Sequence, residues 1–139
     1  HQFQRMKSIS LQRAIVSKGQ FGASLGSLGD IDGDGFMDFV VGAPFEGSGA
    51  VYLYRGHADL QIGPYSQKIT PESAGIPGPV KGFGYSFSNV ADVDENGTPD
   101  FGIGALDSDK ALIIRSKRVV RISPKSFYKG EKLIEPSSN

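Results

Sequence analysis

The sequence repeats itself, and this internal repeat limits the folds open to the chain more than any other feature. Residues 21–44 align with residues 83–106 at an offset of 62, and ten of the 24 aligned positions are identical. The identical positions begin with Phe21/Phe83 and Gly22/Gly84 and end with Gly42/Gly104 and Ala43/Ala105. Residues 49–56 then align with residues 109–116 at an offset of 60. Two copies of one supersecondary unit are therefore expected.

The apolar segments of each copy are short and rich in residues that favour β-strands. They read "FVVGA", "AVYLY", "FGIGA", "ALII" and "RVVRI", and turn residues separate them. Such runs predict strands of about five residues and an all-β fold. Each copy would contain a strand near its Phe-Gly, an acidic loop, two more strands, and a fourth strand at 67–69 or 119–122. Four antiparallel strands make one blade of a β-propeller, and closed propellers have about four to eight blades. We therefore expect a propeller fragment.

The repeat also divides the chain into four segments. Residues 1–20 would hold the outer strand of a preceding blade, and residues 21–76 the first complete blade with its loop at 30–38. Residues 77–122 would form the second blade with its loop at 92–100. Residues 123–139 would begin a following domain or form a tail.

The acidic loops place oxygen-bearing side chains at relative positions 1, 3, 5 and 9. The predicted metal ligands are Asp30, Asp32, Asp34 and Asp38 in the first loop and Asp92, Asp94, Asn96 and Asp100 in the second. At position 7 we expect the backbone carbonyls of Phe36 and Thr98, and at position 6 a glycine allows the sharp turn. Six to eight oxygen ligands are what Ca²⁺ prefers, so the pattern predicts two structural calcium sites.

Two alternatives to this interpretation differ in strength. An EF-hand needs a glutamate at position 12, where Val41 and Ile103 stand, and it needs helical flanks, so we reject it. The second alternative is that both loops are metal-free turns, in which aspartate side chains accept hydrogen bonds from the backbone, and the sequence leaves this alternative open. Asn96 stands in the second loop at the position that Asp34 has in the first. The first loop therefore has four carboxylates and the second has three, and we expect the first loop to bind calcium more tightly.

Composition and motifs argue against other functions. The 15 basic and 15 acidic residues balance, which gives no general attraction to nucleic acid, and the chain has no cysteine for a disulfide or a thiolate. No apolar stretch approaches the ~20 residues of a membrane span. Residues 22–26 match the G-x-S-x-G motif of hydrolases, but only His57 follows and the second copy has Ser88 in place of Gly26. We expect neither catalysis nor an organic cofactor.

The motifs together resemble a known repeat. "FG" at 21–22, "GAP" at 42–44, the intervening D-x-D-x-D-G-x-x-D loop and "GAVYLYRG" at 49–56 resemble the FG-GAP repeat of integrin α subunits. The second copy differs from this pattern in having Leu106 in place of the proline. The order of segments is similar to the last two blades of the integrin α propeller, where such loops lie away from the ligand-binding face and have a structural role.

The resemblance implies a cell-surface adhesion and signalling receptor. The chain would be part of its extracellular portion, paired with an integrin β subunit and binding an extracellular-matrix or cell-surface protein. A membrane span would lie outside this fragment. FG-GAP blades also resemble parts of secreted enzymes such as a GPI-specific phospholipase D, and a free-standing calcium-dependent propeller is a third reading. Fold alone does not decide among them.

Overall fold

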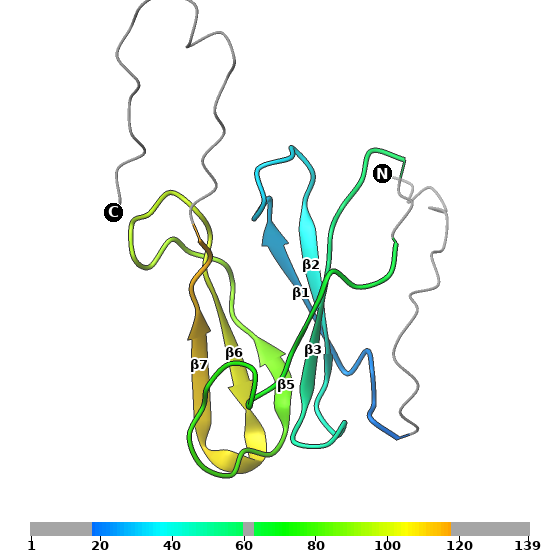
Figure 1. The fold of residues 1–139 in the computed structure, drawn as a ribbon, viewed down its shortest axis with the longest axis vertical. Helices are drawn as coiled ribbons and strands as arrows, with labels where there is room; N and C mark the ends of the chain where they lie inside the picture. Colours follow the sequence, from blue (N-terminus) through cyan, green and yellow to red (C-terminus); the bar gives the residue numbers. More distant parts are fainter. Residues whose placement is uncertain (1–17, 60–62, 118–139) are drawn as a thin grey trace, which may run out of the picture.

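The computed structural model describes residues 18–59 and 63–117, and within them it is all-β (Figure 1). The elements are β1 (Ser24–Gly29), β2 (Asp38–Ala43), β3 (Ala50–Tyr54), β4 (Gln67–Ile69), β5 (Phe83–Phe87), β6 (Phe101–Ala105), the 3₁₀ helix η1 (Leu106–Ser108) and β7 (Lys110–Ile114). Residues 1–17 of the segment expected at 1–20 lie outside the described residues, as do the segments expected at 119–122 and 123–139. None of the described residues forms a helix long and apolar enough to cross a membrane.

The first copy of the repeat forms a four-stranded antiparallel sheet in the order β1-β2-β3-β4. In β2, Val40 and Val41 point to opposite faces, yet they are 0% and 1% exposed. All five residues of β3 are buried as well. Strands that are covered on both faces read as continuous apolar runs, which explains why "FVVGA" and "AVYLY" do not alternate with polar residues.

The second copy forms a three-stranded antiparallel sheet in the order β5-β6-β7. Its register repeats that of the first sheet, since Ala105 pairs with Lys110 as Ala43 pairs with Ala50. The predicted fourth strand of this blade, at 119–122, falls outside the described residues. The two sheets are consistent with two propeller blades, and their strands lie within the predicted ranges 21–76 and 77–122.

The sheets pack face to face around a shared apolar core. Phe83 at the start of β5 is 0% exposed and lies in this core with Val40 and Val51. The hydroxyl of Ser24 donates a hydrogen bond to the carbonyl oxygen of Gly84 over 2.5 Å, which joins β1 to β5. A Cβ atom on Gly84 would come within 2.7 Å of the backbone oxygen of Ala50. The Phe-Gly of the second copy is therefore a contact between the two sheets.

The Phe-Gly of the first copy differs in its surroundings. The ring of Phe21 packs edge-on against Tyr52, with 5.3 Å between ring centroids. A Cβ atom on Gly22 would meet nothing within 4 Å, so close strand approach does not account for this glycine. Its φ of +93° does account for it, because side chains rarely tolerate that conformation.

A buried polar network lies on the β3–β4 side of the first sheet. The hydroxyl of Tyr52 donates to the carboxylate of Glu46, at 2.7 and 2.8 Å from its two oxygens, and the ammonium of Lys68 pairs with the same carboxylate. Burial and the hydrogen bond to Glu46 raise the pKa of Tyr52 from 10.0 to about 12. The hydrogen bond to Glu46 also raises the pKa of Lys68.

Both acidic loops lie at the same end of the two sheets. The loop between β1 and β2 and the loop between β5 and β6 both lie at the top of Figure 1, and the β2–β3 and β6–β7 turns lie at the bottom. The packing of the two sheets therefore places the two candidate metal sites on one side of the molecule.

Candidate metal centres

The first acidic loop is closed by hydrogen bonds from backbone N–H groups to its own aspartates. The carboxylate of Asp30 accepts from the N–H of Asp34 at 3.0 Å and from the N–H of Gly35 at 2.8 Å. Asp32 accepts from the N–H of Asp34 at 3.1 Å, and Asp34 from the N–H of Phe36 at 2.8 Å. The N–H of Gly35 lowers the pKa of Asp30 below its ordinary value. These bonds fold the carboxylates inward over a tight turn.

Asp38 anchors this loop to the sheet. It is the first residue of β2, is 1% exposed, and accepts from the N–H of Ile31 and from the N–H of Gly56, both at 3.0 Å. Its carboxylate thus joins the acidic loop to the chain just after β3. Burial raises the pKa of Asp38, whereas the N–H groups of Gly56 and Ile31 act in the opposite direction.

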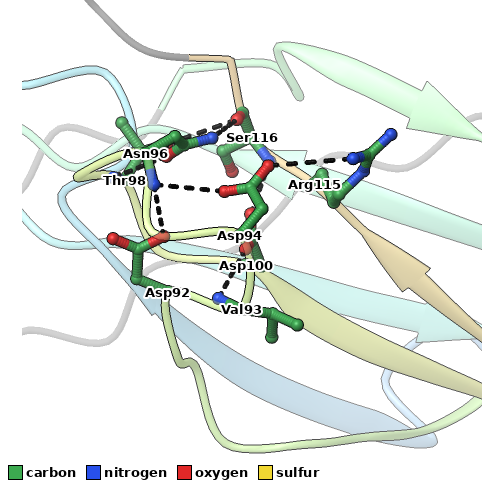
Figure 2. A network of polar contacts seen from close by, with 8 residues as sticks. All are labelled: Asp92, Val93, Asp94, Asn96, Thr98, Asp100, Arg115 and Ser116. Carbon is green, nitrogen blue, oxygen red and sulfur yellow. Dashed lines mark hydrogen bonds and ion pairs between the residues drawn. The ribbon is translucent and has the colours of Figure 1, made fainter. Parts of the chain in front are cut away.

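The second loop repeats this arrangement (Figure 2). Asp92 accepts from the N–H of Asn96 at 3.0 Å and from the N–H of Gly97 at 2.8 Å. Asp100 is 0% exposed and accepts from the N–H groups of Val93 and Ser116, both at 2.9 Å. Every one of these bonds matches a bond of the first loop at the offset of the repeat. The two loops therefore share one hydrogen-bond pattern.

The folding of each loop gathers three carboxylates. Oxygen atoms of Asp30, Asp32 and Asp38 lie within 4.8 Å of one another, and so do those of the second set. The second set is Asp92, Asp94 and Asp100. This donor set consists of carboxylate oxygens alone, which fits a hard divalent cation such as Ca²⁺ and does not suit soft metals. Both clusters are compatible with divalent cation binding.

The side chains predicted to bind metal at position 5 also make hydrogen bonds within their loops. Asp34 is not among the three converging carboxylates. Asn96 donates from its side-chain nitrogen to the carbonyl of Ser116 at 2.9 Å, and its side-chain oxygen accepts from the N–H and the hydroxyl of Thr98. The structure therefore engages position 5 in loop closure. That Asp34 and Asn96 also bind metal, together with the carbonyls of Phe36 and Thr98, remains a prediction.

Sequence reasoning missed the arginine beside each loop. The Nε of Arg55, just after β3, lies 3.4 Å from Oδ2 of Asp32. The Nη1 of Arg115, just after β7, lies 3.9 Å from Oδ2 of Asp94 (Figure 2). The signal was present in the sequence, because both arginines occupy the same position of the repeat, 60 residues apart.

The serine of the hydrolase-like motif has a structural partner. The hydroxyl of Ser24 donates to the carbonyl oxygen of Gly84, whereas a serine nucleophile must donate to a base. Ser24 therefore joins the two sheets through its hydroxyl.

Comparisons with known proteins identify a repeat family and a group of similar proteins. Residues 21–54 match the family model of the FG-GAP repeat. The chain is 39% identical over 121 residues to integrin alpha-3 of Cricetulus griseus, which covers 87% of the chain and 11% of that protein. It is 41% identical over 124 residues to integrin alpha-PS2 of Drosophila melanogaster, covering 85% of the chain and 9% of that protein. Over 103 residues it is 42% identical to human integrin alpha-7, covering 74% and 8%.

Residues 21–54 are thus an FG-GAP repeat, and over most of its length the chain is similar to integrin α subunits. This confirms the resemblance inferred from the motifs. The chain spans about a tenth of the length of the relatives it matches.

Proposed function

We propose that this chain is a calcium-stabilised part of the extracellular propeller of an integrin α subunit. The observation that carries the proposal is the duplicated cluster of three converging carboxylates, formed in both loops by the same hydrogen bonds. A bound Ca²⁺ would offset the repulsion among these carboxylates and fix each loop against its blade. Asp30, Asp32 and Asp38 would hold one ion, and Asp92, Asp94 and Asp100 the other.

The role proposed for the metal is structural. Asp38 and Asp100 each join a loop to the chain after the third strand of its blade, through the N–H groups of Gly56 and Ser116. An ion bound to these aspartates would therefore stabilise the hairpin and the neighbouring strand together. We further propose that the first loop binds more tightly, because it carries four carboxylates and the second has three.

The longer protein would act in adhesion at the cell surface. We infer pairing with an integrin β subunit and recognition of a matrix or cell-surface protein from the similarity to integrin α subunits. Catalysis is no part of this proposal, and nothing observed favours the enzyme-linked alternative over it. Co-precipitation of the longer protein with co-expressed β subunits tests the pairing, and no recovery of any β subunit would contradict it.

The calcium proposal is tested by a calorimetric titration of the chain with CaCl₂. We expect two saturable sites, with dissociation constants of about 10⁻⁴–10⁻³ M, as is usual for extracellular calcium modules. The variant Asp32→Asn/Asp94→Asn should bind much more weakly, since each loop loses a ligand charge. Both side chains are partly exposed, so the fold should persist, and circular dichroism checks this.

A matched control removes the same two charges elsewhere. Asp107→Asn/Asp109→Asn lies at the opposite end of the second blade, where both residues are exposed. It should bind calcium like the original chain. Equal heats for all three proteins, or none for the folded original chain, would contradict the proposed sites.

A further inference from the structure

Each acidic loop is accompanied by one arginine at an equivalent position. Arg55 lies beside Asp32 and Arg115 beside Asp94, with nitrogen–oxygen distances of 3.4 and 3.9 Å. The two arginines are 60 residues apart and the two aspartates 62 apart, as the repeat requires. The same cation–carboxylate contact has therefore been built twice, at the second acidic residue of both loops.

The geometry of these contacts decides which of two roles they can have. An arginine that positions a metal ligand should hold it through a two-pronged, well-buried contact. Here each contact is a single nitrogen–oxygen approach, and the arginine side chains are 57% and 71% exposed. Exposed contacts of this kind restrain a side chain only weakly. The charge of the guanidinium, in contrast, acts on the loop without requiring precise geometry.

We propose that Arg55 and Arg115 are built-in counter-cations that compete with the metal. While no ion is bound, each guanidinium offsets part of the negative charge gathered in its loop. When an ion binds, the same positive charge repels it and shares Asp32 or Asp94 with it. The arginines therefore lower the calcium affinity of loops that otherwise carry three or four carboxylates. This inference rests on the proposed function.

The expected effect follows from Coulomb's law. A unit charge and a divalent ion about 5 Å apart in a water-like environment repel each other, and after screening by physiological salt this repulsion changes affinity by about 3- to 10-fold. The variant Arg55→Gln should therefore bind calcium about 3- to 10-fold more tightly at the first loop. The effect of Arg115→Gln on the second loop should be smaller, because Arg115 is farther from its aspartate and more exposed. Raising the salt concentration should shrink both effects, since salt screens exposed charges.

The experiment is a calcium titration of the ¹⁵N-labelled chain followed by NMR. The amides of Gly35 and Gly97 report on the two loops separately, because they donate to Asp30 and Asp92, both at 2.8 Å. The original chain is compared with Arg55→Gln, Arg115→Gln and a control, Lys81→Gln. Lys81 is exposed and lies at the opposite end of the second blade, next to Ser108. Each arginine variant should tighten binding at its own loop alone, and Lys81→Gln should change neither.

The possible failures are distinguishable. In one outcome, calcium shifts the amide resonances of the original chain, but Arg55→Gln binds calcium with unchanged or weaker affinity. This result would overturn this inference and leave the proposed function standing. Weaker affinity would show that the arginine positions Asp32. A folded original chain in which neither glycine amide responds to calcium would remove the proposed function and this inference with it.

Discussion

The buried hydroxyl of Tyr52 should make the first blade sensitive to alkali. The folded chain raises the pKa of Tyr52 from 10.0 to about 12, because the phenol is buried and donates to Glu46. The folded state therefore keeps a proton that the unfolded state loses above pH 10. Stability from this group is complete below pH 10 and is lost as the pH rises toward 12. A difference of about two pKa units corresponds to about 2–3 kcal/mol.

Removing the hydroxyl removes this dependence. At pH 8, Tyr52→Phe should be less stable than the original chain by about 1.5–3 kcal/mol, the range for a hydrogen bond to a charged group. Between pH 10 and 12 the original chain should lose that advantage, so the two unfolding free energies converge. The hydrogen bond to Glu46 raises the pKa of Lys68 as well, and Lys68 is present in both proteins.

The assay is urea unfolding of both proteins at pH 8, 10 and 11.5, followed by circular dichroism. Tyr85→Phe serves as the control, because Tyr85 is 45% exposed and its variant should follow the original chain at each pH. A constant free-energy difference between the original chain and Tyr52→Phe across this range would contradict the raised pKa of Tyr52. It would mean that the folded state does not hold the phenol proton.

Three further predictions concern packing and metal. Phe83→Ala should cost about 3–5 kcal/mol of unfolding free energy, since Phe83 is 0% exposed, whereas Phe45→Ala, at a position 46% exposed, should cost far less; urea titrations compare them, and similar losses would contradict the shared core. Gly84→Ala should destabilise the chain more than Gly22→Ala. Both glycines have positive φ, but only at Gly84 would the new Cβ atom come within 2.7 Å of the backbone oxygen of Ala50. Equal shifts in melting temperature would count against close contact between the sheets. Adding 1 mM Ca²⁺ should stabilise the chain by about 1–3 kcal/mol through the two sites, measured as a rise in melting temperature that EDTA reverses, and the absence of a rise would contradict stabilisation by calcium.

The features that could be predicted from the sequence are those that recur in both copies of the repeat. The strands, the antiparallel hairpins and the position of Phe83 between blades follow from short apolar runs and from residues that recur in register. The convergence of Asp30, Asp32 and Asp38 follows from spacing and a turn glycine, because a tight loop has few ways to arrange them. Local rules suffice for these features.

Other features depend on contacts between distant segments. The pairing of Tyr52 with Glu46 and Lys68 joins a strand, a turn and an edge strand, and no spacing rule specifies it. The anchoring of Asp38 by the N–H of Gly56 likewise requires the register of β2 on β3. Gly22 and Gly84 recur at the same position of the repeat, yet only Gly84 lies in a close contact, and Gly22 serves its backbone conformation alone.

The most direct test of the central proposal is a crystal structure of this chain grown in millimolar calcium, with anomalous scattering used to locate the ions. We expect one calcium ion in each loop. The first should be bound by Asp30, Asp32 and Asp38, and the second by Asp92, Asp94 and Asp100. Ordered loops with no anomalous peak at either cluster would contradict it and would show that backbone N–H groups and the flanking arginines alone hold these carboxylates together.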